Sequence, residues 1–133
     1  PLNPTKYAEM LGEKMKKHNV NVWLVNTGWT GGAFGVGERM KLRFTRAMVT
    51  AALNGELDKA DYAEHPVFGV AMPANCPGVP TEVLDPRNMW KDKAAYDNQA
   101  DILAKAFRSN FDKYRKSATA EIIAAEPKAR VNA

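Results

Sequence analysis

A short apolar run that leads directly into a cluster of glycines constrains the fold of this chain more than any other feature. Residues 20–25 read Val-Asn-Val-Trp-Leu-Val, and residues 26–37 then hold five of the nine glycines. A nearly continuous, β-branched run of this length is typical of a strand buried on both faces of a parallel sheet. The glycines predict a long flexible loop at the carboxyl end of that strand, where α/β folds bind ligands.

Helical patterns on both sides of this run predict a mixed α/β fold. Asn3 and Pro4 provide a cap and a first position for a helix over residues 4–18. Helical spacing predicts a second helix over residues 43–54 and a short helix over 118–125. Between them it predicts a long amphipathic helix, capped by Asn88, with an apolar stripe over 96–114. Residues 67–72 predict a second strand, and the prolines of 73–86 predict a loop without regular structure.

The helix over 4–18 joined directly to the strand over 20–25 resembles the second half of a βα–β unit. We therefore expect the sequence to begin in the middle of a motif, as a processed chain or a piece of a longer one. Length predicts a single segment over residues 1–133, with a mobile polar tail over 127–133.

Composition excludes several classes of protein. The formal net charge of +4 fits anionic ligands, but basic residues do not alternate with aromatic ones as in nucleic-acid-binding modules. A single cysteine, Cys76, excludes an intramolecular disulfide and favours a reducing, intracellular setting. No apolar run is long enough to span a bilayer.

The strongest candidate site from the residues alone is the glycine loop and the basic segment after it. Arg39, Lys41, Arg43 and Arg46 face only one nearby acid, Glu38. Backbone N–H groups of glycines approach anions closely, so the pattern predicts a nucleotide or another phosphorylated ligand. The glycines match neither the Walker pattern nor the dinucleotide fingerprint. A mobile surface loop followed by a solvated basic helix start is the alternative.

Other reactive side chains give weaker patterns. His18 and His65 have no companion at metal-ligand spacing and are interpreted as surface histidines. No base is apparent for the Cys76 thiol. Acidic residues of the long helix, Asp92, Asp97 and Asp101, alternate with lysines as on a solvated face. The sequence therefore predicts no catalytic pair and no metal site.

Longer motifs, taken in order, resemble the C-terminal part of the ATP-dependent phosphoenolpyruvate carboxykinase family. They comprise residues 24–32 (Leu-Val-Asn-Thr-Gly-Trp-Thr-Gly-Gly), 35–42 (Gly-Val-Gly-Glu-Arg-Met-Lys-Leu), 45–47 (Thr-Arg-Ala), 77–80 (Pro-Gly-Val-Pro), 84–88 (Leu-Asp-Pro-Arg-Asn), 110–114 (Asn-Phe-Asp-Lys-Tyr) and 124–127 (Ala-Ala-Glu-Pro). The resemblance covers essentially the whole chain.

This resemblance implies part of the C-terminal mononucleotide-binding domain of a cytoplasmic gluconeogenic enzyme, a carboxy-lyase. Such enzymes convert oxaloacetate and ATP to phosphoenolpyruvate, CO2 and ADP with Mg2+ and Mn2+. It implies that Arg39, Met40 and Thr45 bind ATP, near the adenine and ribose. The phosphate-binding loop, the metal ligands and the oxaloacetate-binding residues of the family lie upstream of the matched motifs. We therefore expect the remainder of a parent carboxykinase as partner and no activity from this chain alone.

The chain departs from the family pattern at Glu38, where many relatives carry Lys, and at Glu126, where the family has Gly. At Glu38, a negative charge that pointed into the nucleotide loop would weaken the attraction of phosphates. At Glu126, the change affects only a local turn. The alternative from a different class is a free-standing nucleotide-binding, anion-binding or interaction module without catalysis.

Overall fold

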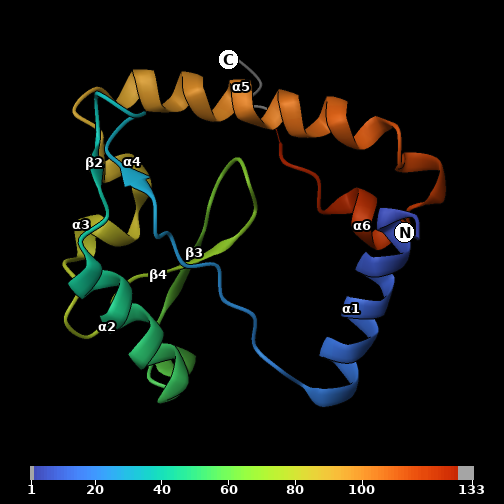
Figure 1. The fold of residues 1–133 in the computed structure, drawn as a ribbon, viewed down its shortest axis with the longest axis horizontal. Helices are drawn as coiled ribbons and strands as arrows, with labels where there is room; N and C mark the ends of the chain where they lie inside the picture. The colour runs from blue at the N-terminus through green and yellow to red at the C-terminus, as the bar shows by residue number, and fades with distance from the viewer. Residues whose placement is uncertain (1, 129–133) are drawn as a thin grey trace.

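The computed structural model describes residues 2–128. In chain order its elements are α1 (Pro4–His18), β1 (Trp29–Thr30), β2 (Glu38–Arg39), α2 (Leu42–Leu53), η1 (Leu57–Lys59), β3 (Tyr62–Glu64), β4 (Ala71–Pro73), α3 (Thr81–Leu84), α4 (Pro86–Met89), α5 (Lys93–Asp112), η2 (Arg115–Ser117) and α6 (Ala120–Ala124). Helix α5 runs along one side, with α2, α3 and α4 toward its beginning and α1 and α6 toward its end (Figure 1).

Local capping explains where the predicted helices begin and end. The side chain of Asn3 accepts a hydrogen bond from the Thr5 N–H at 3.0 Å, and Asn19 ends α1 in the left-handed conformation at φ 47°. These contacts confirm the helix predicted over 4–18. Helix α2 confirms the prediction over 43–54 to within one residue at each end.

The strands form two small antiparallel pairs in the described part of the chain. Strand β1 pairs with β2, and Trp29 lies opposite Arg39. Strand β3 pairs with β4, and Tyr62 lies opposite Pro73. This mixture of helices and small sheets is consistent with the predicted α/β class, although no parallel pair occurs among residues 2–128.

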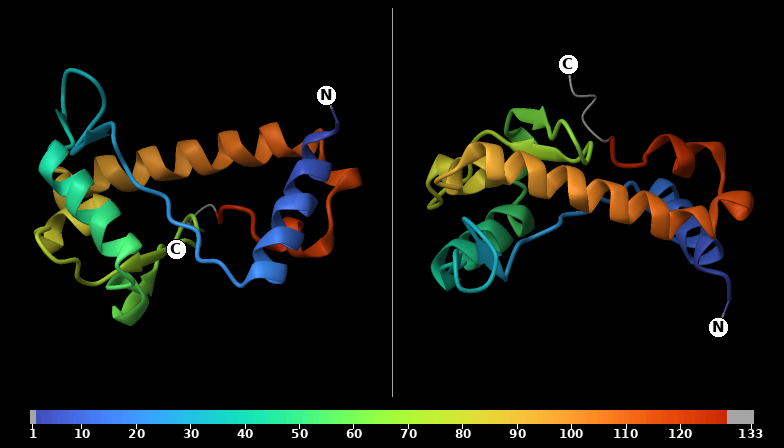
Figure 2. Two further views of the ribbon diagram at one scale, coloured as in Figure 1. Left: turned by 60° about the horizontal axis from the view of Figure 1, so that its bottom comes forward. Right: turned by 90° about the horizontal axis from the view of Figure 1, so that it is seen from above.

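The expectation of a strand over 20–25 is not met by the described residues. These residues are extended between α1 and the β1–β2 hairpin, and they belong to neither sheet. Both views of Figure 2 show this segment crossing from one end of the molecule to the other. A strand needs a hydrogen-bonded neighbour, and residues 2–128 supply none here.

Three further expectations need correction. The second strand covers residues 71–73 rather than 67–72, because residues 66–68 form a turn. Residues 73–86 are not free of regular structure, since they contain α3. The long helix begins at Lys93 with Asp92 as its cap, whereas Asn88 lies in α4. The mobile tail predicted over 127–133 falls mostly outside the described residues.

The buried side chains form two clusters. One contains Met40 and Phe44 beside α2, together with Leu57, Cys76 and Val79. The other packs Val67 against Ala100 and Ala104, on one face of α5. Small residues allow the turn at 66–68 to lie directly on the helix. The rest of the predicted α5 stripe is less covered, and Phe107 is 51% exposed.

The short C-terminal segment folds back onto α5 and α1. Glu126 lies 2.5 Å from Arg115 and 3.6 Å from Arg108, and Lys16 of α1 pairs with Glu121 of α6 at 3.0 Å. Glu126 is the departure from the family's glycine, and here it connects the last residues to α5. Among the helices described, none has the length and apolar character needed to cross a membrane.

Candidate functional site

The glycine-rich segment forms a closed hairpin rather than the flexible loop that the sequence predicted. The N–H groups of Val36 and Gly37 both bond to the Ala33 carbonyl, at 3.0 and 2.9 Å. The N–H of Met40 bonds to the Gly28 carbonyl at 2.8 Å, which extends the pairing of β1 with β2. The hairpin therefore fixes the path of the chain that leads into α2.

The hairpin leaves no room for a side chain at Gly37. A Cβ added at Gly37 would lie 2.6 Å from the Gly32 carbonyl oxygen and still closer to that of Thr30. Both neighbours are backbone atoms, so they cannot rotate away. The two sides of the hairpin approach one another this closely because no side chain separates them.

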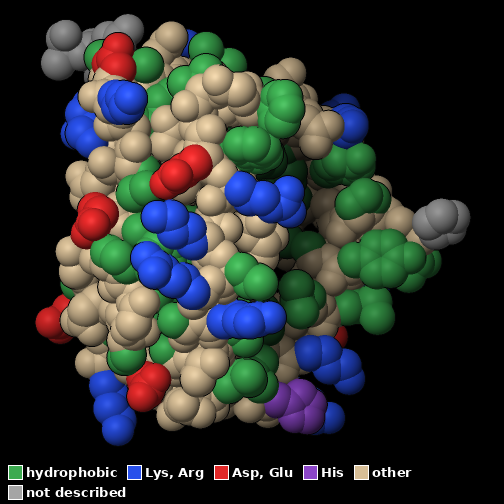
Figure 3. Space-filling view, turned by 60° about the vertical axis from the view of Figure 1, so that its left-hand side comes forward, with side chains coloured by type: hydrophobic (Ala, Val, Ile, Leu, Met, Phe, Trp, Pro, Cys, Tyr) green, Lys and Arg blue, Asp and Glu red, His purple; other side chains and the backbone are tan. Residues whose placement is uncertain are grey.

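Exposed cations leave the hairpin and continue into α2. Arg39, Lys41, Arg43 and Arg46 are all exposed, and none forms an ion pair with a described residue. Figure 3 shows Lys and Arg side chains gathered on the face that carries β2 and α2. We call these four residues the cationic surface. Unpaired cations on one face attract anions from solution.

The sequence-predicted ATP residues occupy different environments. Arg39 is exposed on β2, Thr45 is half-buried in the first turns of α2, and Met40 is 8% exposed in the core. Consecutive residues of an extended chain point to opposite sides, which places the Met40 side chain away from that of Arg39. Met40 lines a hollow of about 680 Å³ that neither Arg39 nor Thr45 lines. Their joint role in binding ATP stays a prediction.

An exposed aromatic pair flanks the cationic surface. Trp29, which lies opposite Arg39, meets Phe34 edge to face with ring centroids 5.0 Å apart. Both rings are exposed, Phe34 to 81%. Because directly opposed residues of an antiparallel pair share one face of the sheet, Trp29 and Arg39 lie on the same side of the hairpin.

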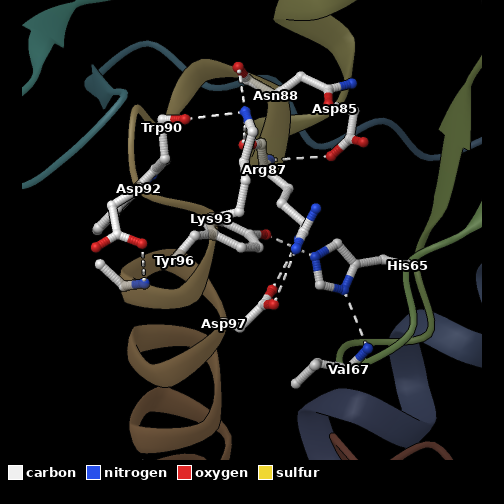
Figure 4. A network of polar contacts seen from close by, with 11 residues as sticks. His65, Val67, Asp85, Arg87, Asn88, Trp90, Asp92, Lys93, Tyr96 and Asp97 are labelled. Carbon is white, nitrogen blue, oxygen red and sulfur yellow. Dashed lines mark hydrogen bonds and ion pairs between the residues drawn. The ribbon is translucent and has the colours of Figure 1, made fainter.

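His65 is one of the residues that the sequence analysis placed wrongly. It is 4% exposed and lies 2.7 Å, through Nε2, from the hydroxyl of Tyr96 on α5 (Figure 4). Its Nδ1 accepts hydrogen bonds from the N–H groups of Val67 and Phe68, each at 3.2 Å. Because Nδ1 of the neutral ring accepts these hydrogen bonds, the proton is on Nε2. The Nε2–H group therefore donates a hydrogen bond to the hydroxyl of Tyr96. The ring therefore fastens the turn at 66–68 to α5.

A second set of polar contacts fastens α4 to α5. The guanidinium of Arg87 donates to both carboxylate oxygens of Asp97, at 2.9 and 3.1 Å. Lys93 donates to three backbone carbonyls at the end of α4, all at 2.9 Å. The sequence analysis expected Asp97 on a solvated face of the helix, and this expectation is wrong because Asp97 binds Arg87. Asp92 is the N-terminal cap of α5. These contacts hold α4 against α5.

The lone thiol, Cys76, is buried. Burial, and secondarily the carboxylate of Glu56, raises the pKa of the Cys76 thiol. A buried thiol with a raised pKa is a poor nucleophile at neutral pH. Within residues 2–128, no group of three or more metal-ligating side chains comes together.

Sequence reasoning missed the buried histidine and the aromatic pair for different reasons. The burial of His65 depends on Tyr96, which is 31 residues away along the chain. The Trp29–Phe34 contact depends on the closure of the hairpin, which the glycine count suggested only as a loop. The Gly-Gly pair at 31–32 and Gly37, spaced around a turn, were the signal for that closure.

Comparisons with known proteins place this chain among carboxykinases. A family model described as phosphoenolpyruvate carboxykinase matches residues 1–82, which include the hairpin and the cationic surface. Three relatives are named phosphoenolpyruvate carboxykinase (ATP). The one from Flavobacterium johnsoniae is 61% identical over 127 residues (96% of this chain, 24% of the relative), that from Brevibacillus brevis 58% over 130 (98% and 24%), and that from Caldanaerobacter subterraneus 55% over 128 (96% and 24%). The chain spans about a quarter of the length of these relatives.

Proposed function

The chain belongs to the phosphoenolpyruvate carboxykinase family, and from this premise we propose that it supplies part of the ATP site of an ATP-dependent carboxykinase. The complete enzyme would convert oxaloacetate and ATP to phosphoenolpyruvate, CO2 and ADP. The observation that carries the proposal is the family match over residues 1–82, which spans Arg39, Met40 and Thr45.

The cationic surface supports a nucleotide as the ligand. Phosphoryl transfer depends mainly on positioning and on neutralising the charge of the phosphates. Arg39 lies on β2, where it is exposed and forms no ion pair with a described residue. A planar guanidinium of this kind can bind a phosphate, donate to a ribose oxygen or lie over a purine. Thr45 adds a hydroxyl one turn into α2.

Met40 has a different part in the proposal. Its side chain packs with Phe44 in the core and lines the hollow beneath the hairpin. It therefore supports the backbone that carries Arg39, and it offers an apolar wall to a base only from the inner side. The proposal assigns no catalytic residue to this chain.

The remaining elements of the reaction are proposed to lie in the rest of the polypeptide. The resemblance to the family implies that the ligands of Mg2+ and Mn2+ lie outside this chain. We therefore propose that the chain alone does not form phosphoenolpyruvate. The cytoplasmic, gluconeogenic setting implied by the resemblance is part of the proposal, and the single buried thiol of Cys76 supports a reducing compartment.

A chimera tests the role of Arg39. In this chimera the present chain replaces the matched 127-residue section of the Flavobacterium johnsoniae relative. Loss of a charge-assisted hydrogen bond costs about 1.5–3 kcal/mol, so Arg39→Ala should raise KM for ATP about tenfold or more. KM for oxaloacetate should change little. Lys17→Ala removes one exposed charge from α1 and is the matched control.

Two outcomes would contradict the proposal. If Arg39→Ala leaves both KM for ATP and kcat at the control values, Arg39 has no role at the nucleotide. If the chain alone binds ATP stoichiometrically while the chimera has no carboxykinase activity, the free-standing binding module is the better account.

A further inference from the structure

We propose that Lys93 is a positioning residue for the hairpin that carries Arg39. Its ammonium group holds the backbone carbonyls at the end of α4, and the end of α4 supports the hairpin at Gly31. The expected effect on ATP rests on the proposed function. The support of the hairpin does not rest on it, and the two can be measured separately.

The ammonium group of Lys93 uses its donors on one short stretch of backbone. Its Nζ donates to the carbonyl oxygens of Arg87, Asn88 and Trp90, each at 2.9 Å (Figure 4). An ammonium group has three N–H donors, so these three acceptors satisfy it. Lys93 forms no ion pair with a described residue. Its charge therefore acts on the end of a helix, where the carbonyls carry partial negative charge.

Helix α4 depends on such side chains because it is a single turn. Its last carbonyls have no partner within the helix, and one turn is too short to be stable by itself. At its beginning, the carboxylate of Asp85 accepts a hydrogen bond from the Arg87 N–H at 3.0 Å. The Arg87 guanidinium is in turn bound to Asp97 of α5. Lys93 supplies the donors at the other end of the turn.

The end of α4 lies directly against the glycine hairpin. A Cβ added at Gly31 would lie 3.0 Å from the carbonyl oxygen of Met89 and 3.7 Å from its carbonyl carbon. Met89 is the last residue of α4, and Gly31 follows Thr30 at the end of β1. Both surfaces are backbone, so no flexible side chain can absorb a shift of α4. A displacement of the end of α4 therefore moves the hairpin.

The hairpin transmits this displacement to Arg39. Trp29, two residues before Gly31, lies opposite Arg39 in the pairing of β1 with β2. The Met40 N–H, next in the chain, is bonded to the Gly28 carbonyl at 2.8 Å. A shift at Gly31 is therefore carried across the pair to Arg39. Such shifts matter, because a misplacement of about 1 Å by a distant mutation can cost an enzyme about 100-fold.

Lys93→Met and Lys91→Met form the matched pair of variants. Methionine keeps the unbranched shape of the side chain and removes the three donors. Lys91 is an exposed lysine two residues away that forms no ion pair with a described residue. In the chimera, Lys93→Met should raise KM for ATP about threefold, which is less than the roughly tenfold rise expected of Arg39→Ala. KM for oxaloacetate should not change, and Lys91→Met should change neither.

The separation of KM from kcat distinguishes positioning from stability. A merely structural role of Lys93 would reduce the fraction of folded enzyme, which lowers kcat and leaves KM for ATP unchanged. A double variant adds a second criterion. With Arg39→Ala already present, Lys93→Met should raise KM no further, because the group that it positions is absent. Additive effects of the two changes would overturn the inference.

Hydrogen exchange measures the support of the hairpin without a nucleotide. The amides of Gly37 and Met40, which bond within the hairpin, should exchange about tenfold faster in Lys93→Met than in Lys91→Met. Equal exchange overturns the inference, whatever the effect of Arg39→Ala. Faster exchange with no effect of Arg39→Ala on KM for ATP supports the link from Lys93 to the hairpin and refutes the proposed ATP role. Faster exchange with KM for ATP raised by Arg39→Ala but not by Lys93→Met overturns the inference.

A second pair of variants tests the same contact from the side of the hairpin, and it applies even if Lys93→Met does not fold. Gly31→Ala and Gly35→Ala both place a side chain at a left-handed φ, 75° and 86°. Nothing lies within 4 Å of a Cβ added at Gly35, so only Gly31→Ala also presses on Met89. Gly31→Ala should therefore raise KM for ATP about twofold more than Gly35→Ala, with faster exchange of the hairpin amides. Equal KM and equal exchange in these two variants would overturn the inference.

Discussion

Replacement of Gly37 by alanine should open the hairpin that carries Arg39. The added methyl group would lie 2.6 Å from the carbonyl oxygen of Gly32 and 2.7 Å from its nitrogen, and closest of all to the carbonyl oxygen of Thr30. All three are backbone atoms of the opposite side of the hairpin. The only relief is separation of the two sides, which breaks the pairing of Thr30 with Glu38.

The expected cost follows from these contacts. Inserting a methyl group into a well-packed site costs about 1–3 kcal/mol, and each lost hydrogen bond adds about 1 kcal/mol. We therefore expect Gly37→Ala to lower the free energy of unfolding by about 3 kcal/mol. That is a large share of the stability of a typical domain, which is about 5–15 kcal/mol.

Urea unfolding of the chimera measures this loss, and the part of the near-ultraviolet circular dichroism that Trp29→Phe removes reports on the hairpin. The edge contact of Trp29 with Phe34 depends on hairpin closure and should disappear in the variant. Gly12→Ala is the control, because nothing lies within 4 Å of a Cβ added there. Gly12 lies within α1, so this change should stabilise by about 0.5–1 kcal/mol. A loss below about 0.5 kcal/mol at Gly37, with the Trp29 signal intact, would refute the steric argument.

Two further predictions concern a helix cap and an alkaline titration. Asp92→Ala removes the side chain that accepts a hydrogen bond from the Ala95 N–H at 3.0 Å. The free energy of unfolding in urea should fall by about 1 kcal/mol. An unchanged unfolding midpoint would exclude a capping role. Burial raises the pKa of Cys76 above its ordinary value of 9.0, so the thiol stabilises the fold below that pH and loses this contribution as pH rises through the folded pKa. Unfolding midpoints compared at pH 7 and about pH 10 should therefore fall less in Cys76→Ala than in the parent, with a residual fall from Tyr62, whose pKa burial also raises. Equal falls in both proteins would exclude Cys76 as a source.

The elements that could be predicted from sequence are those with local causes. Helix α1 is determined by Asn3, Pro4 and Asn19, all within or beside the helix, and the prediction matches its bounds. Helix α5 was predicted by its spacing, but its start was misplaced, because Asn88 and Asp92 are both acceptable caps. Tertiary contacts decided between them, since Arg87 binds Asp97 and leaves α4 as a separate turn.

The strands were harder to predict because their partners are not local. The run at 20–25 has the composition of a buried strand, yet it pairs with no strand among residues 2–128. His65 shows the same limit at a single side chain. Nothing near it in sequence indicates burial, and the hydroxyl of Tyr96 on α5 supplies the contact that stabilises it there.

The candidate site depends both on local sequence and on tertiary contacts, and Met40 is the residue at which the two meet. The exposed residues Arg39 and Lys41 flank a side chain that packs in the same cluster as Phe44 and Leu57. Because Met40 is fixed in the core and its N–H is bonded to Gly28, the backbone at Arg39 has little freedom to rotate. The backbone therefore directs the exposed Arg39 side chain to one side of the hairpin, although its own rotamers still lose freedom when a ligand binds. Under the proposed function, a change in Met40 packing should therefore alter ATP binding through the backbone that carries Arg39.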